Sequence, residues 1–196
     1  MKQLLIATHN KHKKEEIAHL LSTGEYEILD LDDVSNAPAT IEDQPTLEGN
    51  ALKKAREAFA STGMLTLADD TGLEVYYLAL EPGVYSARYS GEQATYASNN
   101  RLLLERLQGV PPRRRSARFR TVVAIVGHNI ERTVEGTVEG IILESSRGTE
   151  GFGYDPLFQP EGSQKTYAEM GLDEKNTLSH RARAFTQAVR VLKELS

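Results

Sequence analysis

The sequence predicts an α/β protein in which a mixed β-sheet is flanked by helices. Short apolar runs of strand length alternate with segments of helical periodicity in the first third of the chain, and two β-rich segments in the second half flank a turn. The 196 residues are 39% hydrophobic and contain no internal repeat or long linker. This length can bury a substantial core, so one domain spanning residues 1–196 is expected.

The first elements are predicted to be a strand, a helix and a second strand. Lys2–Ala7 is an apolar run typical of a buried strand. A helix is expected from near Lys13, because apolar residues then recur three and four positions apart. Thr8–His12 connects the two. A second strand is predicted at Tyr26–Leu31, and the proline-containing segment 36–45 is predicted to be a loop.

A capped helix and a short strand are predicted next. Thr46 is a suitable N-cap and Gly63 a suitable C-terminal stop, and the residues between them place small and apolar side chains on one stripe. The apolar run Leu65–Asp69 predicts a strand. Because Thr71–Gly72 is a turn signal, this strand is expected to stop on the acid pair Asp69–Asp70.

The middle of the chain is predicted to contain a helix and a long hairpin. An irregular stretch begins at Glu81 and continues to Gly91, after which Thr95 can cap a helix. Phe119–Val126 and Arg132–Leu143 have the composition of an antiparallel strand pair, joined by a turn at Gly127–Asn129.

The C-terminal region is predicted to be a loop followed by a helix. Gly148–Gly162 is rich in glycine and proline, and the last helix is expected to begin at Ser179. The side chains expected on the buried face of that helix are Phe185, Ala188, Val189, Leu192 and Leu195.

Composition limits the classes of function. The chain contains no cysteine, so thiolate metal sites and a cysteine nucleophile are excluded. The N-terminal apolar stretch Leu4–Ala7 is too short for a signal peptide or a membrane span, which predicts a cytoplasmic location and no membrane partner. The net charge is −5, and the basic run Arg113–Arg115 is expected to form an exposed turn, so nucleic-acid binding is not expected.

A polar segment lies where the first strand is expected to lead into the first helix. Thr8, Asn10 and Lys13 could bind phosphate there together with backbone N–H groups of the helix start. An alternative is that Thr8 or Asn10 simply caps the helix. His9 and His12 lack the helical spacing of a known histidine metal motif, so metal binding by them is not expected.

Acidic residues form a second set that could bind a metal or act in catalysis. They are Glu42, Asp43, Glu48, Asp69 and Asp70. Mg²⁺ takes oxygen ligands, typically one or two carboxylates together with substrate phosphates and water, so this set suits a nucleotide-bound Mg²⁺. A remaining carboxylate could act as a general base toward water. The alternative is that the acid pair only solvates a strand end.

Two further segments could bind a flat ligand. Gly151–Pro156 places Phe152 and Tyr154 between glycines, where a ring can stack on a base and the backbone can approach closely. These aromatic residues could equally fold the loop onto the core. In Lys175–Arg181, the two terminal cations and His180 offer fixed charge and a hydrogen-bond donor to a carbonyl oxygen.

Six motifs in this order resemble the inosine triphosphate pyrophosphatase family over nearly the whole chain. They are Ala7-Thr8-x-Asn10-x-x-Lys13, Asn50-Ala51-x-x-Lys54-Ala55, Ala68-Asp69-Asp70-Thr71-Gly72-Leu73, Pro82-Gly83-Val84-Tyr85-Ser86-Ala87-Arg88, Gly151-Phe152-Gly153-Tyr154-Asp155-Pro156 and Ser179-His180-Arg181. The resemblance implies Mg²⁺-dependent hydrolysis of ITP, dITP and XTP to the monophosphate and pyrophosphate. It also implies an elongated sheet with a cleft between two lobes, and a homodimer.

The resemblance implies a role for each matching residue. Asp70 would be the general base and a metal ligand, with Asp69 beside it as a second catalytic acid and Glu42 as a second metal ligand. The residues implied to bind the triphosphate are Thr8, Asn10, Lys13, Lys54 and Thr71. Those implied to bind the base are Phe152, Gly153, Tyr154, Asp155, Lys175, His180 and Arg181. The chain departs from the family pattern at His9 and His12, where glycine is common, and at Gly49, where glutamate is frequent.

Two other functions fit the same residues. One is a Maf-like pyrophosphatase of pyrimidine or modified nucleotides. The other is a protein that binds nucleotides without hydrolysing them, although acids beside a triphosphate would then weaken binding unless a metal joins them.

Overall fold

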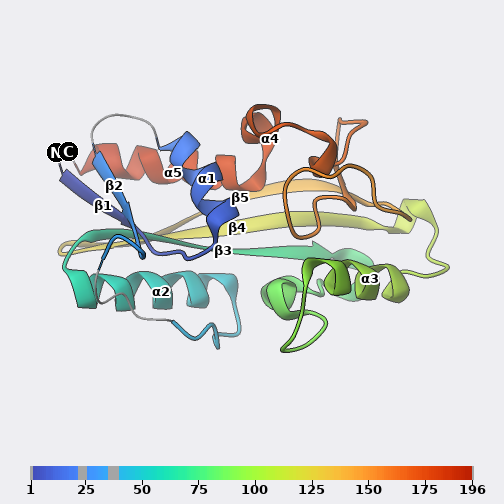
Figure 1. The fold of residues 1–196 in the computed structure, drawn as a ribbon, viewed down its shortest axis with the longest axis horizontal. Helices are drawn as coiled ribbons and strands as arrows, with labels where there is room; N and C mark the ends of the chain where they lie inside the picture. The colour runs from blue at the N-terminus through green and yellow to red at the C-terminus, as the bar shows by residue number, and fades with distance from the viewer. Residues whose placement is uncertain (1, 22–25, 35–39, 196) are drawn as a thin grey trace. The chain divides into compact units, whose positions relative to one another are not determined.

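The computed structural model describes residues 2–21, 26–34 and 40–195. Its strands form one six-stranded sheet in the order β2-β1-β3-β4-β5-β6 (Figure 1). The strands are β1 (Lys2–Ile6), β2 (Tyr26–Asp30), β3 (Leu65–Val75), β4 (Ser116–Gly127), β5 (Ile130–Ile142) and β6 (Phe158–Pro160). β1 pairs in parallel with β2 and β3, whereas β5 and β6 are antiparallel. The predicted mixed sheet with flanking helices is therefore confirmed.

The helices are α1 (Lys11–Leu20), α2 (Leu47–Thr62), α3 (Tyr96–Arg106), α4 (Leu172–Leu178) and α5 (His180–Glu194). Several helix ends form as local sequence predicts. The Asn10 side chain accepts from the backbone N–H groups of His12 and Lys13 and so caps α1. Thr46 caps α2, which ends at Gly63 in the left-handed conformation. Thr95 caps α3 as expected.

The chain divides into two compact units, each with its own core. The first unit, called unit 1, comprises Met1–Asp70, Thr121–Gly136 and Arg181–Ser196. The second, unit 2, comprises Thr71–Arg120 and Thr137–His180. The single domain and the cleft between lobes both stay predictions.

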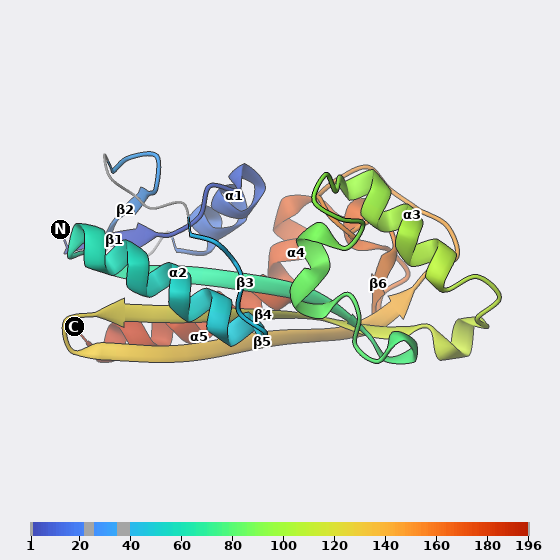
Figure 2. The same cartoon turned by 90° about the horizontal axis from the view of Figure 1, so that it is seen from below.

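Helices cover both faces of the sheet strands in unit 1. Helices α1 and α5 lie on one face, and α2 lies on the other (Figures 1 and 2). Leu4 and Ile6 of β1 form a core with Ile17 of α1 and Phe185 of α5, all at most 4% exposed. This packing fixes the elements that carry the predicted phosphate-binding residues.

The core of unit 2 joins α3 to the strands and to the loop after β5. Leu103 and Leu107 at the end of α3 cluster with Phe119 of β4 and Phe158 of β6. The Phe119 and Phe158 rings meet edge to face, with centroids 4.8 Å apart. The segment 148–162, predicted to be loop throughout, therefore contains the short strand β6.

The prediction that the third strand stops at the acid pair is wrong. Strand β3 continues without a break from Leu65 through Asp69 and Asp70 to Val75. Both acid side chains have cationic partners, so their charges do not force the strand to end. At Gly72 a Cβ would lie 2.6 Å from the carbonyl oxygen of Gly83. This glycine permits a close approach of two backbones rather than a turn.

Three smaller predictions also need correction. The last helix begins at His180, because Ser179 is the C-cap of a separate helix, α4. Leu195 lies beyond the end of α5 and is 43% exposed. Arg115 is buried, since its guanidinium donates to the carbonyl groups of Leu107, Ile142 and Leu143. It is therefore a structural clamp and not part of an exposed turn.

Other predicted bounds of helices and strands on the described residues hold with shifts of up to three positions, the largest at the start of β4, which begins at Ser116 and not at Phe119. The hairpin of β4 and β5 forms as expected, and α1 begins two residues before Lys13. The residues 35–39 of the predicted loop lie outside the described part of the chain.

Candidate active site

Asp69 lies in a buried group of cations in unit 1. Its Oδ2 is 2.8 Å from Lys13 Nζ and 3.8 Å from Arg181 Nε. Arg181 in turn donates to the buried carboxylate of Glu16. Burial alone would raise the pKa of Asp69, but Lys13, Arg181 and Lys54 outweigh it and hold that pKa well below its usual range. Asp69 is therefore a permanent anion at neutral pH.

Asp70 has a different environment. Asn50 Nδ2 donates to its Oδ2 across 3.1 Å, and Lys54 Nζ lies 3.4 Å from its Oδ1. Burial raises the pKa of Asp70, an effect that Glu42 adds to and that Lys54 and Lys13 only partly offset. A carboxyl with a raised pKa is a better proton acceptor than an ordinary aspartate, as a general base requires.

The different surroundings of the two acids follow from strand geometry. Successive side chains on a strand point to opposite faces of the sheet. Asp69 thus meets Lys13 of α1 and Arg181 of α5, while Asp70 meets Asn50 and Lys54 of α2. These helices lie on the two faces of the strands (Figure 1). The two adjacent carboxylates consequently lie in different electrostatic environments.

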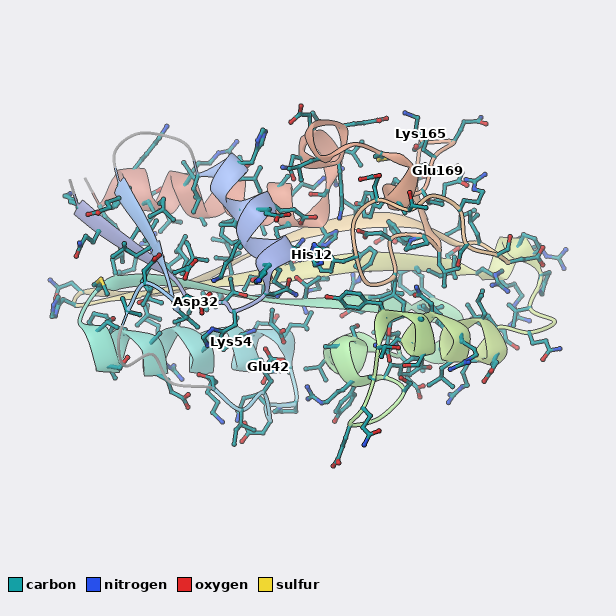
Figure 3. The ribbon with its side chains drawn as sticks, viewed as in Figure 1. His12, Asp32, Glu42, Lys54, Lys165 and Glu169 are labelled. Atoms are coloured by element: carbon teal, nitrogen blue, oxygen red, sulfur yellow. The ribbon has the colours of Figure 1, made fainter. Side chains whose placement is uncertain are left out.

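Three oxygen atoms surround the Lys54 ammonium. It lies 2.8 Å from Glu42 Oε1 and donates to the Asp69 carbonyl oxygen at 2.6 Å, in addition to its contact with Asp70. Glu42 and Lys54 lie side by side at α2 and the loop before it (Figure 3). Burial raises the pKa of Glu42, but Lys54 reverses the direction, so the pKa is lowered. Two carboxylates therefore share one cation here.

The loop between β1 and α1 also has a defined conformation. Thr8 Oγ1 accepts from the Asn10 backbone N–H at 3.2 Å, and Asn10 Oδ1 accepts from the first turn of α1. Asn10 therefore caps the helix, the alternative interpretation of this segment, and also holds the backbone N–H groups at the helix start in place. The exposed His9 lies 3.1 Å from Asp32.

The predicted base-binding residues of unit 2 are centred on a buried ion pair. Lys175 Nζ lies 2.6 Å from Asp155 Oδ2, and both side chains are only 4% exposed. The same Asp155 oxygen accepts from the Phe152 backbone N–H at 2.9 Å. The Lys175 ammonium lies 5.2 Å from the centre of the Phe152 ring. Gly151 is required here, because a Cβ would lie 2.2 Å from Asp155 Oδ2.

The other predicted residues of unit 2 have distinct positions. Tyr154 is buried and donates its hydroxyl to the Ser86 carbonyl at 2.9 Å. His180 stacks on Phe119, with centroids 4.5 Å apart and planes at 15°. Thr71 is half-buried within β3. Substrate contact by these residues stays a prediction.

Sequence reasoning missed two residues of this site. Glu16 accepts a hydrogen bond from Arg181. The Asn50 side chain donates through Nδ2 to Asp70 and accepts through Oδ1 from the Gln44 backbone N–H. Asn50 belongs to a motif used for the resemblance, but no role was predicted for it. The available signal was the position of each polar residue beside the apolar stripe of its helix, since Glu16 lies four positions before Leu20 and Asn50 three positions after Leu47.

Comparisons with known proteins place these residues in a family context. The Ham1 family model matches residues 4–191. A protein of Geobacter sulfurreducens named dITP/XTP pyrophosphatase is 48% identical over 94% of this chain and 93% of its own length. One of the same name from Thermoanaerobacter pseudethanolicus is 46% identical over 93% of this chain and 92% of its own length.

Solved structures agree with the sequence comparisons. A HAM1 protein from Coxiella burnetii is 38% identical and superposes with a TM-score of 0.90 over 99% of this chain and all of the other. The Ham1 protein of Staphylococcus aureus gives a TM-score of 0.89 at 32% identity over the full length of both chains. The likeness thus extends to the whole fold.

Proposed function

Because the chain belongs to the Ham1 family, we propose that it hydrolyses ITP, dITP and XTP, purine nucleoside triphosphates outside the standard four, to the monophosphate and pyrophosphate. The dITP/XTP pyrophosphatases among its relatives support this substrate class. The observation that carries the proposal is the placement of Asp70, a carboxyl with a raised pKa beside the Lys54 ammonium. The reaction removes abnormal nucleotides from the pool.

The cationic side chains of unit 1 suit the triphosphate. A triphosphate carries about four negative charges, which repel an incoming nucleophile until they are neutralised. Lys13 and Lys54 supply fixed positive charge, and the N-terminal end of α1, where Asn10 Oδ1 accepts from the backbone N–H groups of His12 and Lys13, adds the positive end of the helix dipole. We assign Thr8, Asn10, Lys13, Lys54 and Thr71 to this part of the substrate.

The oxygen atoms around Lys54 fit a divalent cation. Glu42 and Asp70 are hard oxygen donors that already converge on one ammonium group. Among residues 2–21, 26–34 and 40–195, no group of three or more acidic, histidine or cysteine side chains forms a metal site. Two carboxylates completed by phosphate oxygens and water are the usual surroundings of nucleotide-bound Mg²⁺. When bound, Mg²⁺ would neutralise phosphate charge and polarise the P–O bonds.

We propose Asp70 as the general base. Asp70 removes a proton from a water molecule, and the water oxygen forms a bond to the α-phosphorus. The bond between that phosphorus and the α–β bridging oxygen breaks, and pyrophosphate leaves. Asn50 orients the Asp70 carboxylate for this step. Hydrolysis in H₂¹⁸O is expected to label the monophosphate; label in pyrophosphate would contradict attack at the α-phosphorus.

The residues that we assign to the base are Phe152, Gly153, Tyr154, Asp155, Lys175, His180 and Arg181. Phe152 offers a ring face, and the Asp155–Lys175 pair keeps its loop in place. Donors aimed at the O6 atom of hypoxanthine or xanthine meet an amino group when adenine enters, and such mismatches can reduce kcat/KM by about 10⁴-fold. We propose His180 or Arg181 as such a donor. An unchanged preference for ITP over ATP in both H180A and R181A would contradict this.

The assembly and the location of the protein are proposals as well. We propose a homodimer, on the resemblance to the family, and a cytoplasmic location. Light scattering after gel filtration measures whether the protein is dimeric. Among the described residues, no helix is long and apolar enough to cross a membrane.

One assay tests the proposal against its alternatives. Purified protein with Mg²⁺ is expected to release pyrophosphate from ITP, dITP and XTP much faster than from ATP, GTP or pyrimidine triphosphates. A preference for pyrimidine nucleotides would favour a Maf-like enzyme. Tight binding of ITP without pyrophosphate release would favour a nucleotide sensor.

A further inference from the structure

A hydrogen bond in unit 2 connects helix α3 to the loop that carries Phe152 and Asp155. Asn100 Nδ2 donates to the Gly153 carbonyl oxygen at 3.0 Å. Gly153 has a φ of +64°, a left-handed conformation between the two aromatic residues of the loop. Figure 2 shows α3 beside the polypeptide that follows β5. The Asn100 amide therefore fixes the turn of the loop from outside.

The neighbouring residue, Asn99, supports the same loop by a longer route. Asn99 Nδ2 donates to the carbonyl groups of Ser86 and Ala87, at 3.3 and 3.1 Å. The Ser86 carbonyl also accepts from the Tyr154 hydroxyl. Two consecutive helix residues thus hold the backbone at Gly153 and the side chain of Tyr154.

The loop gains its internal order from Asp155, which binds the Phe152 N–H and Lys175. The Gly153 carbonyl lies between these two ends of the turn, so a change in its direction alters the Phe152 ring and the Asp155 carboxylate together. Asn100 Oδ1 is buried and has no hydrogen-bond partner in the described structure. The Asn100 amide thus has one protein partner, the carbonyl of the loop.

We infer that Asn100 is a positioning residue for recognition of the base: it holds the Gly153 carbonyl and thereby the Phe152 ring and the Asp155–Lys175 pair. The inference rests on the proposed function, because it assumes that these groups bind the base. Asn100 itself is not required to touch the substrate.

The test is the isosteric substitution Asn100→Asp, which keeps the shape but replaces the donor by a carboxylate that repels the Gly153 carbonyl. At neutral pH we expect KM for ITP to rise about tenfold, the factor typical of one lost hydrogen bond, with kcat changed less than about twofold. The ratio of kcat/KM for ITP to that for ATP is expected to fall.

Activity measured over a range of pH distinguishes a positioning role of Asn100 from a non-specific loss of activity in the variant. Protonation of the carboxylate introduced in N100D restores an O–H donor, so the ratio of variant to wild-type kcat/KM is expected to rise as the pH is lowered. Normalising to the wild type removes the titration of groups shared by both proteins. N100A has no group that can regain a donor, so its ratio is expected to stay constant.

Asn129→Ala is the matched control, because Asn129 is exposed in the turn between β4 and β5 of unit 1. It is expected to leave KM, kcat and selectivity unchanged. Thermal unfolding shows whether N100D folds. If it does not fold, N100A supplies the comparison of KM and selectivity.

Two results would overturn the inference: values of KM and selectivity in N100D and N100A that equal those of the wild type, or a lower kcat at unchanged KM. Absence of pyrophosphate release by the wild-type protein would instead refute the proposed function.

Discussion

Lys13 Nζ lies 2.8 Å from the Asp69 Oδ2 atom, and the Asp69 side chain has no exposed surface. An anion in this position is neutralised by its neighbours and has a lowered pKa, so it is a poor proton acceptor. Asp70, next along the strand, has a raised pKa. The pair therefore separates into an acid that organises lysine and arginine side chains and an acid suited to accept a proton.

Asp69→Asn is expected to destabilise the protein by about 3–5 kcal/mol, because it removes the anion beside the largely buried Lys13 ammonium and leaves Glu16 as the partner of Arg181. Urea unfolding of the variant and the wild type measures the difference. Glu15→Gln is a suitable control, since Glu15 is exposed on α1. Equal unfolding free energies for D69N and wild type would show that the ion pair does not stabilise the fold.

The dependence of stability on pH should carry the signature of Asp69. Its folded pKa is lowered, so the unfolded state binds a proton more readily. The stabilisation is therefore present above the unfolded value of about 4 and is lost as the pH falls toward the folded pKa. The free energy of unfolding of wild-type protein is expected to fall between neutral pH and about pH 3 more steeply than that of D69N.

Asp70→Asn is expected to have opposite effects on activity and stability. Removal of a general base should reduce kcat by about 10²- to 10⁴-fold. The raised pKa means that the folded protein disfavours the charged carboxylate, so the neutral amide should raise the melting temperature at neutral pH. Near-normal turnover of ITP by D70N would remove the proposed base.

Lys54→Met is expected to shift the pH profile of kcat/KM. Lys54 partly offsets the effect of burial on Asp70, so its loss should raise the pKa of Asp70 further. A base works only when deprotonated, and the acidic limb of the profile should therefore move to higher pH. Lys53→Met is the control, because Lys53 pairs with Asp43 at the surface and not with Asp70.

Removal of divalent metal should abolish hydrolysis. EDTA-treated protein is expected to release no pyrophosphate from ITP, and added Mg²⁺ should restore the activity. Glu42→Gln should increase the Mg²⁺ concentration needed for half-maximal rate, because the amide is a weaker ligand than a carboxylate. A half-maximal Mg²⁺ concentration equal to that of wild type would exclude Glu42 as a ligand.

The parts of the fold that local chemistry decides were predictable from sequence. Asn10, Thr46 and Gly63 fix helix ends through contacts with residues two to four positions away. Strand β3 was not predictable in full, because the partners that make Asp69 and Asp70 acceptable inside a strand come from α1, α2 and α5. The buried position of Arg115 depends likewise on carbonyl groups of distant segments.

The candidate site likewise contains residues that the sequence predicted and residues whose roles depend on distant partners. Its motifs identified the carboxylates and lysines, since these residue types are required by phosphate chemistry. They did not reveal that Asn50 orients Asp70 or that Glu16 holds Arg181, because a side chain's partner depends on how helices pack.

Because β3 continues without a break through the two acids, the side of the sheet on which each carboxylate lies is set by its position along the strand. Insertion of a single residue ahead of Asp69 would move the Asp69 carboxylate to the place that Asp70 now occupies and would turn Asp70 to the opposite side of the sheet. Side-chain rotation cannot reverse such a change of side. Insertion of two residues would restore the side of each carboxylate but displace both by about 7 Å along the strand. Both changes of length are thus expected to abolish the pairing of the acids, even where each inserted residue is chemically innocuous.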